Sequence, residues 1–362
     1  MRAARPTLAG ALIAALLTVP AATVLGQAEE FTSSTYVTGT AVEQISYEGT
    51  GGSGSQEGSV SREQGYVLEQ RVDWSDPRLP AEHWIRMDLV IHDESAPDGV
   101  MTVQTSHLLT ASEGTWRGTG RAFETEGDRY SYYELVGQGA YDGLHALLRG
   151  TPGQDAHGPW DVEYDGWIFE GALTEFPEPA EPATGEGMVM RTAPDPEAAT
   201  DAAAAQPSDP MAPAAFYYTT ETVSEPDWGT GTESADGTVS ETRGLEEYER
   251  IEATDPRASG YLVSSQNRTQ VDAPGAMVQT MSMTVRLTND GGSWSGPGQV
   301  LVGGGQIMEM AGMFELTGEG DYEGLTLFLS GSGDFLSQKT WGMIVPSELV
   351  APMPDPVAPV AE

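Results

Sequence analysis

The sequence predicts an all-β protein made of two tandem antiparallel meander β-barrels, of about eight strands each, joined by a disordered Pro/Ala-rich linker. Three observations predict this fold class: an internal repeat at an offset near 180 residues, a period-two alternation of apolar and polar side chains, and turns at short spacing. No helical stripe of comparable length competes. Closing a meander into a barrel removes the exposed edges of an open sheet, and a pair of β-sandwiches is the alternative.

The repeat consists of three ungapped blocks that keep their order along the chain. Residues 58–78 match 237–257, residues 109–118 match 287–296, and residues 133–144 match 314–325. We therefore divide the chain into a signal peptide (1–28), a first barrel repeat (29–176), a linker (177–215), a second barrel repeat (216–349) and a disordered tail (350–362). Eight prolines and twelve alanines in the linker cannot bury a core, and four prolines disfavour order in the tail.

Alternation of apolar and polar residues predicts the strands. Ile85, Met87, Leu89 and Ile91 share one face in the first copy, and Met281, Met283, Val285 and Leu287 share one face in the second. The strands expected in the first copy are 36–47, 59–72, 84–92, 101–110, 115–125, 129–136, 144–148 and 163–169.

The N-terminus has the three parts of a secretory signal. Arg2 and Arg5 supply the positive start, residues 8–19 an apolar run, and residues 20–28 a small-residue cleavage region. The run is too short for the roughly 20 residues that span a bilayer, so we expect a secreted, periplasmic or extracellular chain without a membrane span after cleavage. An uncleaved N-terminal anchor is the alternative.

Composition excludes several classes of function. The chain carries 17 basic and 55 acidic side chains, a formal charge of −38, which disfavours nucleic acid and anionic membranes as partners. Such acidity is typical of proteins from saline habitats. The absence of cysteine excludes disulfides, thiolate metal sites and a thiol nucleophile. The histidine spacings match no compact zinc motif and no EF-hand loop is present, so we expect neither a metal nor a cofactor.

Positions that match between the copies are expected to be structural. The motif Gly-x-Gly-x-Tyr-x-Gly-Leu at 137–144 and 318–325 lacks the spacing and the following helix of a nucleotide-binding loop, and predicts a turn with glycines at positive φ. Asp-Pro-Arg at 76–78 and 255–257 predicts a second turn. The matched residues are Arg71, Asp76, Pro77, Arg78, Trp116, Gly137, Gly139, Tyr141 and Gly143 in the first copy, and Arg250, Asp255, Pro256, Arg257, Trp294, Gly318, Gly320, Tyr322 and Gly324 in the second.

The Asp-Pro-Arg blocks, Gly-Thr-Trp-Arg-Gly at 114–118, Gly-Gly-Ser-Trp-Ser-Gly at 291–296 and the glycine-tyrosine turns carry a family resemblance. The chain resembles the allene oxide cyclase and dirigent-like β-barrel proteins, particularly bacterial secreted members without an assigned activity, and the resemblance covers both repeats. It implies barrels that close around a lipid-sized or phenol-sized molecule. The catalytic carboxylates and arginines of the plant enzymes cannot be matched residue by residue to this chain, so none is transferred.

Two residues are candidates for acid–base chemistry. All five histidines lie in the first copy, and His107 shares the face of Val103 and Leu109, which places it in the barrel interior. A satisfied core histidine is the alternative. Glu134 lies mid-strand, and if its face is the interior it needs a cationic partner. We therefore expect a Glu134–Arg71 pair and a Glu315–Arg250 pair, with a solvated outer face as the alternative.

These observations predict an exported protein that binds a small, mainly apolar molecule without catalysis, or that serves in an envelope or matrix. An isomerase or cyclase of the allene oxide cyclase type, acting in the first barrel through His107 or Glu134, is one alternative. A scaffold whose barrels are filled by their own side chains is the other. The oligomeric state is not encoded in any motif.

Overall fold

The computed structural model describes residues 34–47, 53–57, 60–92, 100–125, 128–152, 162–170, 177–178, 211–223, 226–233, 239–273, 276–304, 308–334 and 339–359. Within these ranges the regular structure is β-strand with two short 3₁₀ turns, and no helix there is long and apolar enough to span a bilayer. The predicted signal peptide and most of the predicted linker lie outside the described residues.

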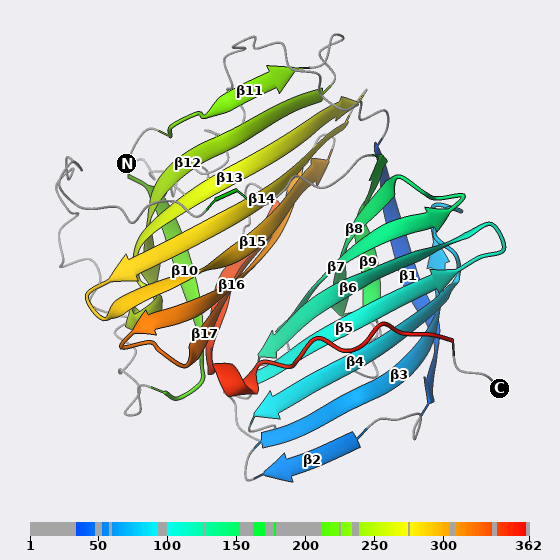
Figure 1. Ribbon diagram of the computed structural model, residues 1–362, viewed down its shortest axis with the longest axis horizontal. Coiled ribbons are helices and arrows are strands. Elements are labelled where there is room, and N and C mark those ends of the chain that lie inside the picture. Colours follow the sequence, from blue (N-terminus) through cyan, green and yellow to red (C-terminus); the bar gives the residue numbers. More distant parts are fainter. Residues whose placement is uncertain are drawn as a thin grey trace, which may run out of the picture. The chain divides into compact units, whose positions relative to one another are not determined.

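The first repeat is a closed eight-stranded antiparallel barrel, which confirms the predicted fold class (Figure 1). Strands β3 to β9 pair in chain order, and β1 closes the ring by pairing with both β9 and β3. An additional short strand, β2, which the sequence pattern did not predict, pairs with the first half of β3. The strands are β1 (Ser34–Tyr47), β2 (Ser53–Glu57), β3 (Val60–Trp74), β4 (Glu82–His92), β5 (Val100–Thr110), β6 (Gly114–Thr125), β7 (Asp128–Gly139), β8 (Leu144–Pro152) and β9 (Val162–Glu170).

The second repeat has the same topology and is a similar ring, less evenly arranged around an axis. Here β10 closes the ring by pairing with β18 and β12, and β11 is the equivalent of β2. The strands are β10 (Ala214–Thr222), β11 (Thr230–Glu233), β12 (Val239–Ala253), β13 (Gly260–Ala273), β14 (Ala276–Asn289), β15 (Gly292–Gly304), β16 (Met308–Gly320), β17 (Leu325–Asp334) and β18 (Lys339–Pro346).

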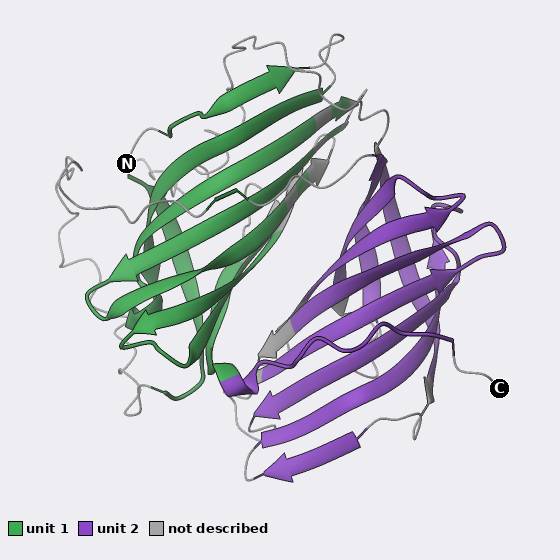
Figure 2. Ribbon diagram, viewed as in Figure 1, with its two compact units in different colours: residues 1–30, 174–347 green, residues 31–173, 348–362 purple. Residues whose placement is uncertain are grey.

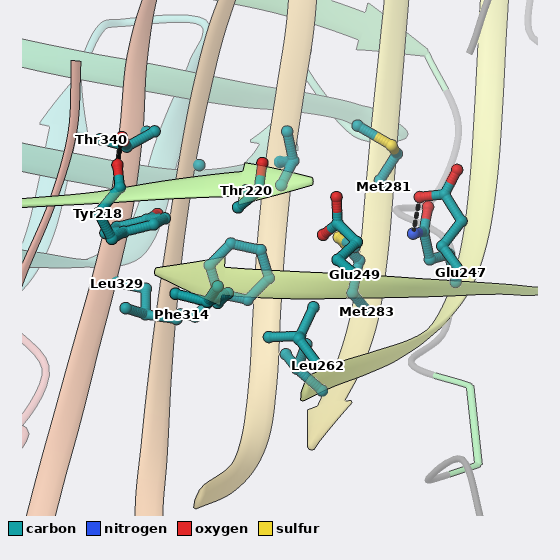
Figure 3. A pocket seen from close by; sticks show the side chains of 16 residues that line it. Tyr218, Thr220, Glu247, Glu249, Leu262, Met281, Met283, Phe314, Leu329 and Thr340 are labelled. Carbon is teal, nitrogen blue, oxygen red and sulfur yellow. Dashed lines mark hydrogen bonds between the residues drawn. The ribbon is translucent and has the colours of Figure 1, made fainter. Parts of the chain in front are cut away.

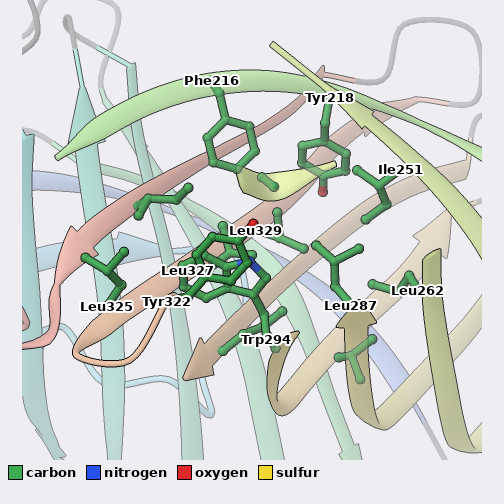
Figure 4. Close-up of a cluster of buried hydrophobic side chains, with 14 residues drawn as sticks. Phe216, Tyr218, Ile251, Leu262, Leu287, Trp294, Tyr322, Leu325, Leu327 and Leu329 are labelled. Carbon is green, nitrogen blue, oxygen red and sulfur yellow. The ribbon is translucent and has the colours of Figure 1, made fainter. Parts of the chain in front are cut away.

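One end of each barrel is filled by a tryptophan that joins the two matched turns. Trp116 Nε1 donates to the carbonyl of Arg78 at 2.7 Å, and Trp294 Nε1 donates to that of Arg257 at 2.8 Å. Both tryptophans are fully buried. Figure 4 shows Trp294 among the leucines of the second core. The two Asp-Pro-Arg turns are therefore connected to the core by a hydrogen bond that a buried indole N–H needs.

The aspartate of each of these turns holds its arginine. Asp76 accepts bonds from the backbone N–H and the guanidinium of Arg78, and Asp255 does the same for Arg257. The Arg78 guanidinium holds the pKa of Asp76 below its usual value and is itself held charged by that carboxylate. Both arginines bond to the aspartate of their own turn, and Arg257 Nη1 also donates to the carbonyl of Ala212 at 3.1 Å.

The glycine-tyrosine motifs form the turns between β7 and β8 and between β16 and β17. Gly139 and Gly143 have φ of +72° and +84°, and Gly320 and Gly324 have +73° and +85°, values that residues with a Cβ adopt at a cost. The tyrosine of each turn stacks on the tryptophan of its barrel, with ring centroids 5.6 Å apart for Tyr141 and Trp116 and 4.7 Å apart for Tyr322 and Trp294.

The chain divides into two compact units, and the C-terminal tail belongs to the unit of the first barrel (Figure 2). We expected residues 350–362 to be disordered, and this expectation was wrong for the described part of the tail. Ala351 and Val357 are 2% and 3% exposed, and Ser106 Oγ donates to the carbonyl of Asp355 at 2.9 Å. Proline content alone misled the prediction, because an extended proline-rich segment can pack on an existing surface without a core of its own.

We predict that Gly318→Ala destabilises the second barrel by about 1–3 kcal/mol, because a Cβ there would overlap the carbonyl oxygen of Tyr322. Gly231→Ala is the matched control in the same barrel, since the nearest atom to its new Cβ is 3.7 Å away. Its free energy of unfolding should change by less than about 0.5 kcal/mol. Urea unfolding of the full chain measures both, and equal effects of the two substitutions would contradict the packing of this turn.

Candidate functional site

The sequence-predicted candidate His107 points into the first barrel and is fully enclosed there. Its Nδ1 lies 2.8 Å from His83 Nε2, and its Nε2 lies 2.6 Å from Thr105 Oγ1. These contacts are satisfied when both imidazoles carry their hydrogen on Nε2, so that His83 donates to His107 and His107 donates to Thr105. His83, which the sequence analysis did not single out, is thus the immediate partner of His107.

Burial keeps both imidazoles neutral. It lowers the pKa of His83 to about 3, and burial together with the neighbouring His83 lowers the pKa of His107 well below its usual value. A general acid or base that works near neutral pH needs a pKa close to that pH and contact with a substrate. His107 has a lowered pKa and is enclosed by protein, with both ring nitrogens bonded, which favours the alternative of a satisfied core histidine.

Aromatic rings fill the space around this pair. Tyr133 meets His107 edge-on at 4.7 Å between ring centroids, Tyr164 lies 5.6 Å from Tyr133, and Trp74 lies 5.2 Å from Tyr164. Their polar atoms are bonded: Tyr164 Oη donates to Gln70 Oε1 at 2.7 Å, and Tyr133 Oη donates to a serine hydroxyl at 2.9 Å. The middle of the first barrel is therefore a packed cluster of rings.

The predicted Glu134–Arg71 and Glu315–Arg250 pairs do not form. Tyr133 and Leu135 belong to the interior core, so Glu134 between them lies on the outer face of β7. Arg71 lies on the outer face of β3, which is four strands from β7 in either direction around the ring. The same separation holds for the second pair, and Arg250 instead contacts Glu252 at 2.9 Å. The expectation failed because spacing along one strand cannot show which strands face each other.

A cavity of about 90 Å³ lies inside the second barrel (Figure 3). Its wall is mostly apolar, and two carboxylates, one amide and two threonines interrupt it. The lining residues are Tyr218, Thr220, Glu247, Glu249, Ile251, Leu262, Gln266, Met281, Met283, Val285, Val300, Gly312, Phe314, Leu329, Gly331 and Thr340.

The cavity exists because the second barrel has smaller side chains where the first has rings. The repeat and the strand registers make Trp74 equivalent to Ala253, and His83 equivalent to Leu262. By the same registers, Val285 replaces His107 and Thr340 replaces Tyr164. Tyr218 restores part of the lost side-chain volume, since its first-barrel equivalent is Gly39. The same backbone ring thus encloses a cluster of packed rings in one copy and a cavity at the equivalent positions in the other.

Glu249 is the chemically distinct group of this cavity. Its side chain comes from β12, where it is 6% exposed, and points among Met281, Met283 and Thr220 in Figure 3. Among the described residues its Oε1 has no hydrogen-bond partner. Burial, and secondarily the charge of Glu247, raises the pKa of Glu249 to about 8. At neutral pH it is therefore an uncharged acid whose O–H is a hydrogen-bond donor.

Glu247, two residues earlier on the same face, is held in place by a buried polar network. Arg268 Nη2 donates to its Oε1 at 3.1 Å, and Gln266 Nε2 donates to its Oε2 at 2.7 Å. The uncharged amide of Gln266 also accepts two hydrogen bonds from the Arg268 guanidinium through its Oε1, at 2.8 and 2.9 Å. Both carboxylate oxygens of Glu247 accept hydrogen bonds from these partners, which leaves Glu249 as the carboxyl group that is free to interact with a ligand.

The sequence contained a signal for this site that we did not use. Leu245, Glu247, Glu249 and Ile251 alternate along β12, so two acids share a face with residues that the pattern assigns to the interior. Gln70 is the first-copy equivalent of Glu249, and a polar residue at the same interior position in both copies marks it further. The described residues contain no group of three or more His, Asp or Glu side chains arranged to hold a metal ion.

We predict that acid destabilises the first barrel through its histidines. Because their pKa values are lowered in the folded state, the unfolded chain binds more protons between about pH 6.5 and 3, and stability falls with decreasing pH across that window. The slope approaches about 1.4 kcal/mol per pH unit for each histidine. The double substitution His83→Leu/His107→Val introduces the residues found at the equivalent positions of the second barrel. It should remove the histidine contribution to the change in the free energy of unfolding between pH 7 and 4.5, measured by urea unfolding. An unchanged slope would contradict the neutral pair.

Two substitutions at the cavity should act in opposite directions on stability. Glu249→Leu removes an unpartnered buried polar atom and should stabilise the second barrel by about 1–3 kcal/mol. Glu247→Leu leaves the buried guanidinium of Arg268 without its carboxylate and should cost about 3–5 kcal/mol. Thermal and urea unfolding at pH 7 measure both effects, and destabilisation by Glu249→Leu would show that this carboxyl is structural.

Comparison with known proteins identifies no relative of this chain. No family model, no curated protein and no solved structure matches the chain. The resemblance to the allene oxide cyclase and dirigent-like proteins is therefore still a prediction from the sequence motifs.

Proposed function

We propose that the second barrel binds a small, mainly apolar, uncharged molecule that carries a hydrogen-bond acceptor such as a carbonyl or hydroxyl oxygen, without catalysis. The observation that carries this proposal is a single unpartnered carboxyl oxygen, that of Glu249, in a mostly apolar cavity. Binding sites for small molecules commonly combine an apolar wall with a few polar groups that orient the ligand. The acid would donate its proton to the acceptor, and the wall would bury the remainder of the molecule.

The size of the cavity restricts the ligand. About 90 Å³ is less than the roughly 150 Å³ of an apolar cavity known to hold benzene, so the ligand has few non-hydrogen atoms or displaces part of the wall. Met281 and Met283 line the space, and unbranched methionine side chains adjust their shape at low cost. A short ketone, alcohol or ether fits this description.

Binding is favoured over the isomerase or cyclase alternative because of where the polar groups lie. His107, the candidate for catalysis in the first barrel, is enclosed by rings and kept neutral. Acid–base catalysis in the second barrel would need a base beside the acid, and Glu247 is occupied by Arg268 and Gln266. The packed ring cluster in the first barrel is compatible with a scaffold role for that copy, while the second copy binds the ligand.

The test compares cyclopentanone with cyclopentane, which differ by the carbonyl oxygen. At pH 6.5 cyclopentanone should bind the full chain at least tenfold more tightly, and the advantage should disappear as pH rises through about 8, since the carboxylate formed there cannot donate. Glu249→Gln keeps an N–H donor at every pH and should retain the advantage, whereas Glu249→Leu should lose it. Ligand-observed NMR measures all of these affinities.

Equal binding of the two probes to the unsubstituted chain would overturn the proposal. Enzymatic turnover of the ketone, detected as loss of its NMR signals, would instead favour the isomerase alternative in the second barrel.

A further inference from the structure

The described tail residues repeat with a period of three. Ala351, Pro354 and Val357 are buried, and the two residues between each pair are exposed. The segment is neither helix nor strand, and its prolines lie at 352, 354, 356 and 359. A polyproline-II helix has three residues per turn, so one residue in three faces the surface on which it lies. The burial pattern is therefore that of a polyproline-II segment with one face packed.

The surface beneath this segment is on the outside of the first barrel, where Figure 1 shows the tail crossing the strands. Val67, Trp84 and Leu108 pack with Val357 in one buried cluster. Trp84 lies between His83 and Ile85, which face the interior, so its ring is on the outer face of β4. An aromatic side chain in a groove is a recurrent feature of sites that bind proline-rich segments.

Polar side chains of the barrel supply donors to the segment's backbone. Thr102 Oγ1 donates to the carbonyl of Leu349 at 2.8 Å, Ser106 Oγ to that of Asp355 at 2.9 Å, and Arg117 Nη1 to that of Val357 at 3.2 Å. Ala351 N–H donates in turn to Thr102 Oγ1 at 3.0 Å. A polyproline-II backbone makes no internal hydrogen bonds, so its carbonyls are available to such donors. We call the barrel residues Val67, Trp84, Thr102, Ser106, Leu108 and Arg117 the outer strip.

The second barrel repeats one element of this arrangement. Thr284 is equivalent to Ser106 by the offset of the β5 and β14 blocks, and its Oγ1 donates to the carbonyl of Glu178 at 3.2 Å. Glu178 lies in the Pro-Glu-Pro stretch that follows the first barrel and belongs to the unit of the second barrel. The residues that follow each repeat are thus proline-rich, and in each case a hydroxyl at the same barrel position binds their backbone.

We propose that the outer strip is a polyproline-II-binding site that accepts the C-terminal segment of a second copy of this chain. The strip binds the segment 349–357, and this segment is joined to the second barrel through Ser347. The same contacts form whether the segment comes from its own chain or from another, and only effective concentration distinguishes the two cases. A chain that gives its segment to a neighbour leaves its own strip open, and such a head-to-tail contact propagates.

The charge of the chain sets the conditions for this exchange. Copies carrying −38 formal charges repel one another, and added salt screens that repulsion. We therefore expect exchange between copies at high protein concentration and high ionic strength. It would supply the physical basis for the matrix role that the sequence left open.

The experiment uses the full chain and a fluorescently labelled synthetic peptide of residues 348–362. In the full-length A351D/V357D variant the chain's own segment carries charges at two buried positions and leaves the strip, so the peptide should bind this variant at least tenfold more tightly than the unsubstituted chain. A peptide with M353D and A358D changes two exposed positions in the same way and should bind within threefold of the original peptide. A peptide with A351D and V357D should lose at least tenfold. Fluorescence anisotropy in 1 M NaCl measures each affinity.

Absence of peptide binding to the A351D/V357D chain, or equal binding of the two charged peptides, would overturn the site. Circular dichroism establishes that the A351D/V357D variant keeps its strands. A second full-length variant, S106A/R117A, removes two donors of the outer strip and should weaken binding of the peptide, while the chain's own segment keeps its sequence. The role of a second copy is tested by sedimentation of the unsubstituted chain in 1 M NaCl. Dimers and larger species that increase with concentration and disappear with excess peptide are expected, and a monomer at every concentration would overturn that part.

Discussion

Closure of each sheet through its first strand is the constraint on which the remaining structure depends. β1 uses one half to pair with β9 and the other half to pair with β3, and β10 does the same between β18 and β12. Once the ring is closed, alternation along every strand divides the side chains into an interior set and an outer set. The cavity and the histidine pair are built from the interior set, and the outer strip is built from the outer set.

The two copies show how one backbone arrangement tolerates opposite interiors. In the first barrel, Trp74, Tyr164 and the two histidines form a packed cluster with its polar atoms largely bonded. In the second, smaller residues occupy the equivalent positions and a carboxyl group is left facing open space. An unpartnered buried acid lowers the free energy of unfolding, and natural proteins commonly retain such destabilising groups at positions that bind a ligand. Packing in one copy and a cavity in the other are consistent with a division of roles between duplicated barrels.

Desolvation acts on the interior groups of both barrels in the same physical way, although the pKa shifts have opposite signs. It disfavours the charged form, so it lowers the pKa of the histidines in the first barrel and raises that of Glu249 in the second. Glu247, two residues from Glu249 on the same face, accepts hydrogen bonds from Arg268 and Gln266. Both interiors thus contain titratable groups without an oppositely charged partner among the described residues, and desolvation keeps these groups neutral at pH 7.

The sequence alone determined the all-β class, the duplication and nearly every strand, because alternation and glycine-containing turns are local and both copies repeat them. It also predicted turns at the Asp-Pro-Arg and glycine-tyrosine motifs, since the geometry of a turn is set by residues close together in the chain. It could not show that Glu134 and Arg71 lie on strands on opposite sides of the ring, because strand pairing is not local. Nor could it select Glu249 rather than His107 as the residue of a ligand site, because that depends on whether side chains from distant strands fill the interior. The tail shows the same limit: its prolines specify an extended segment, and only the outer face of the folded barrel decides whether that segment is bound.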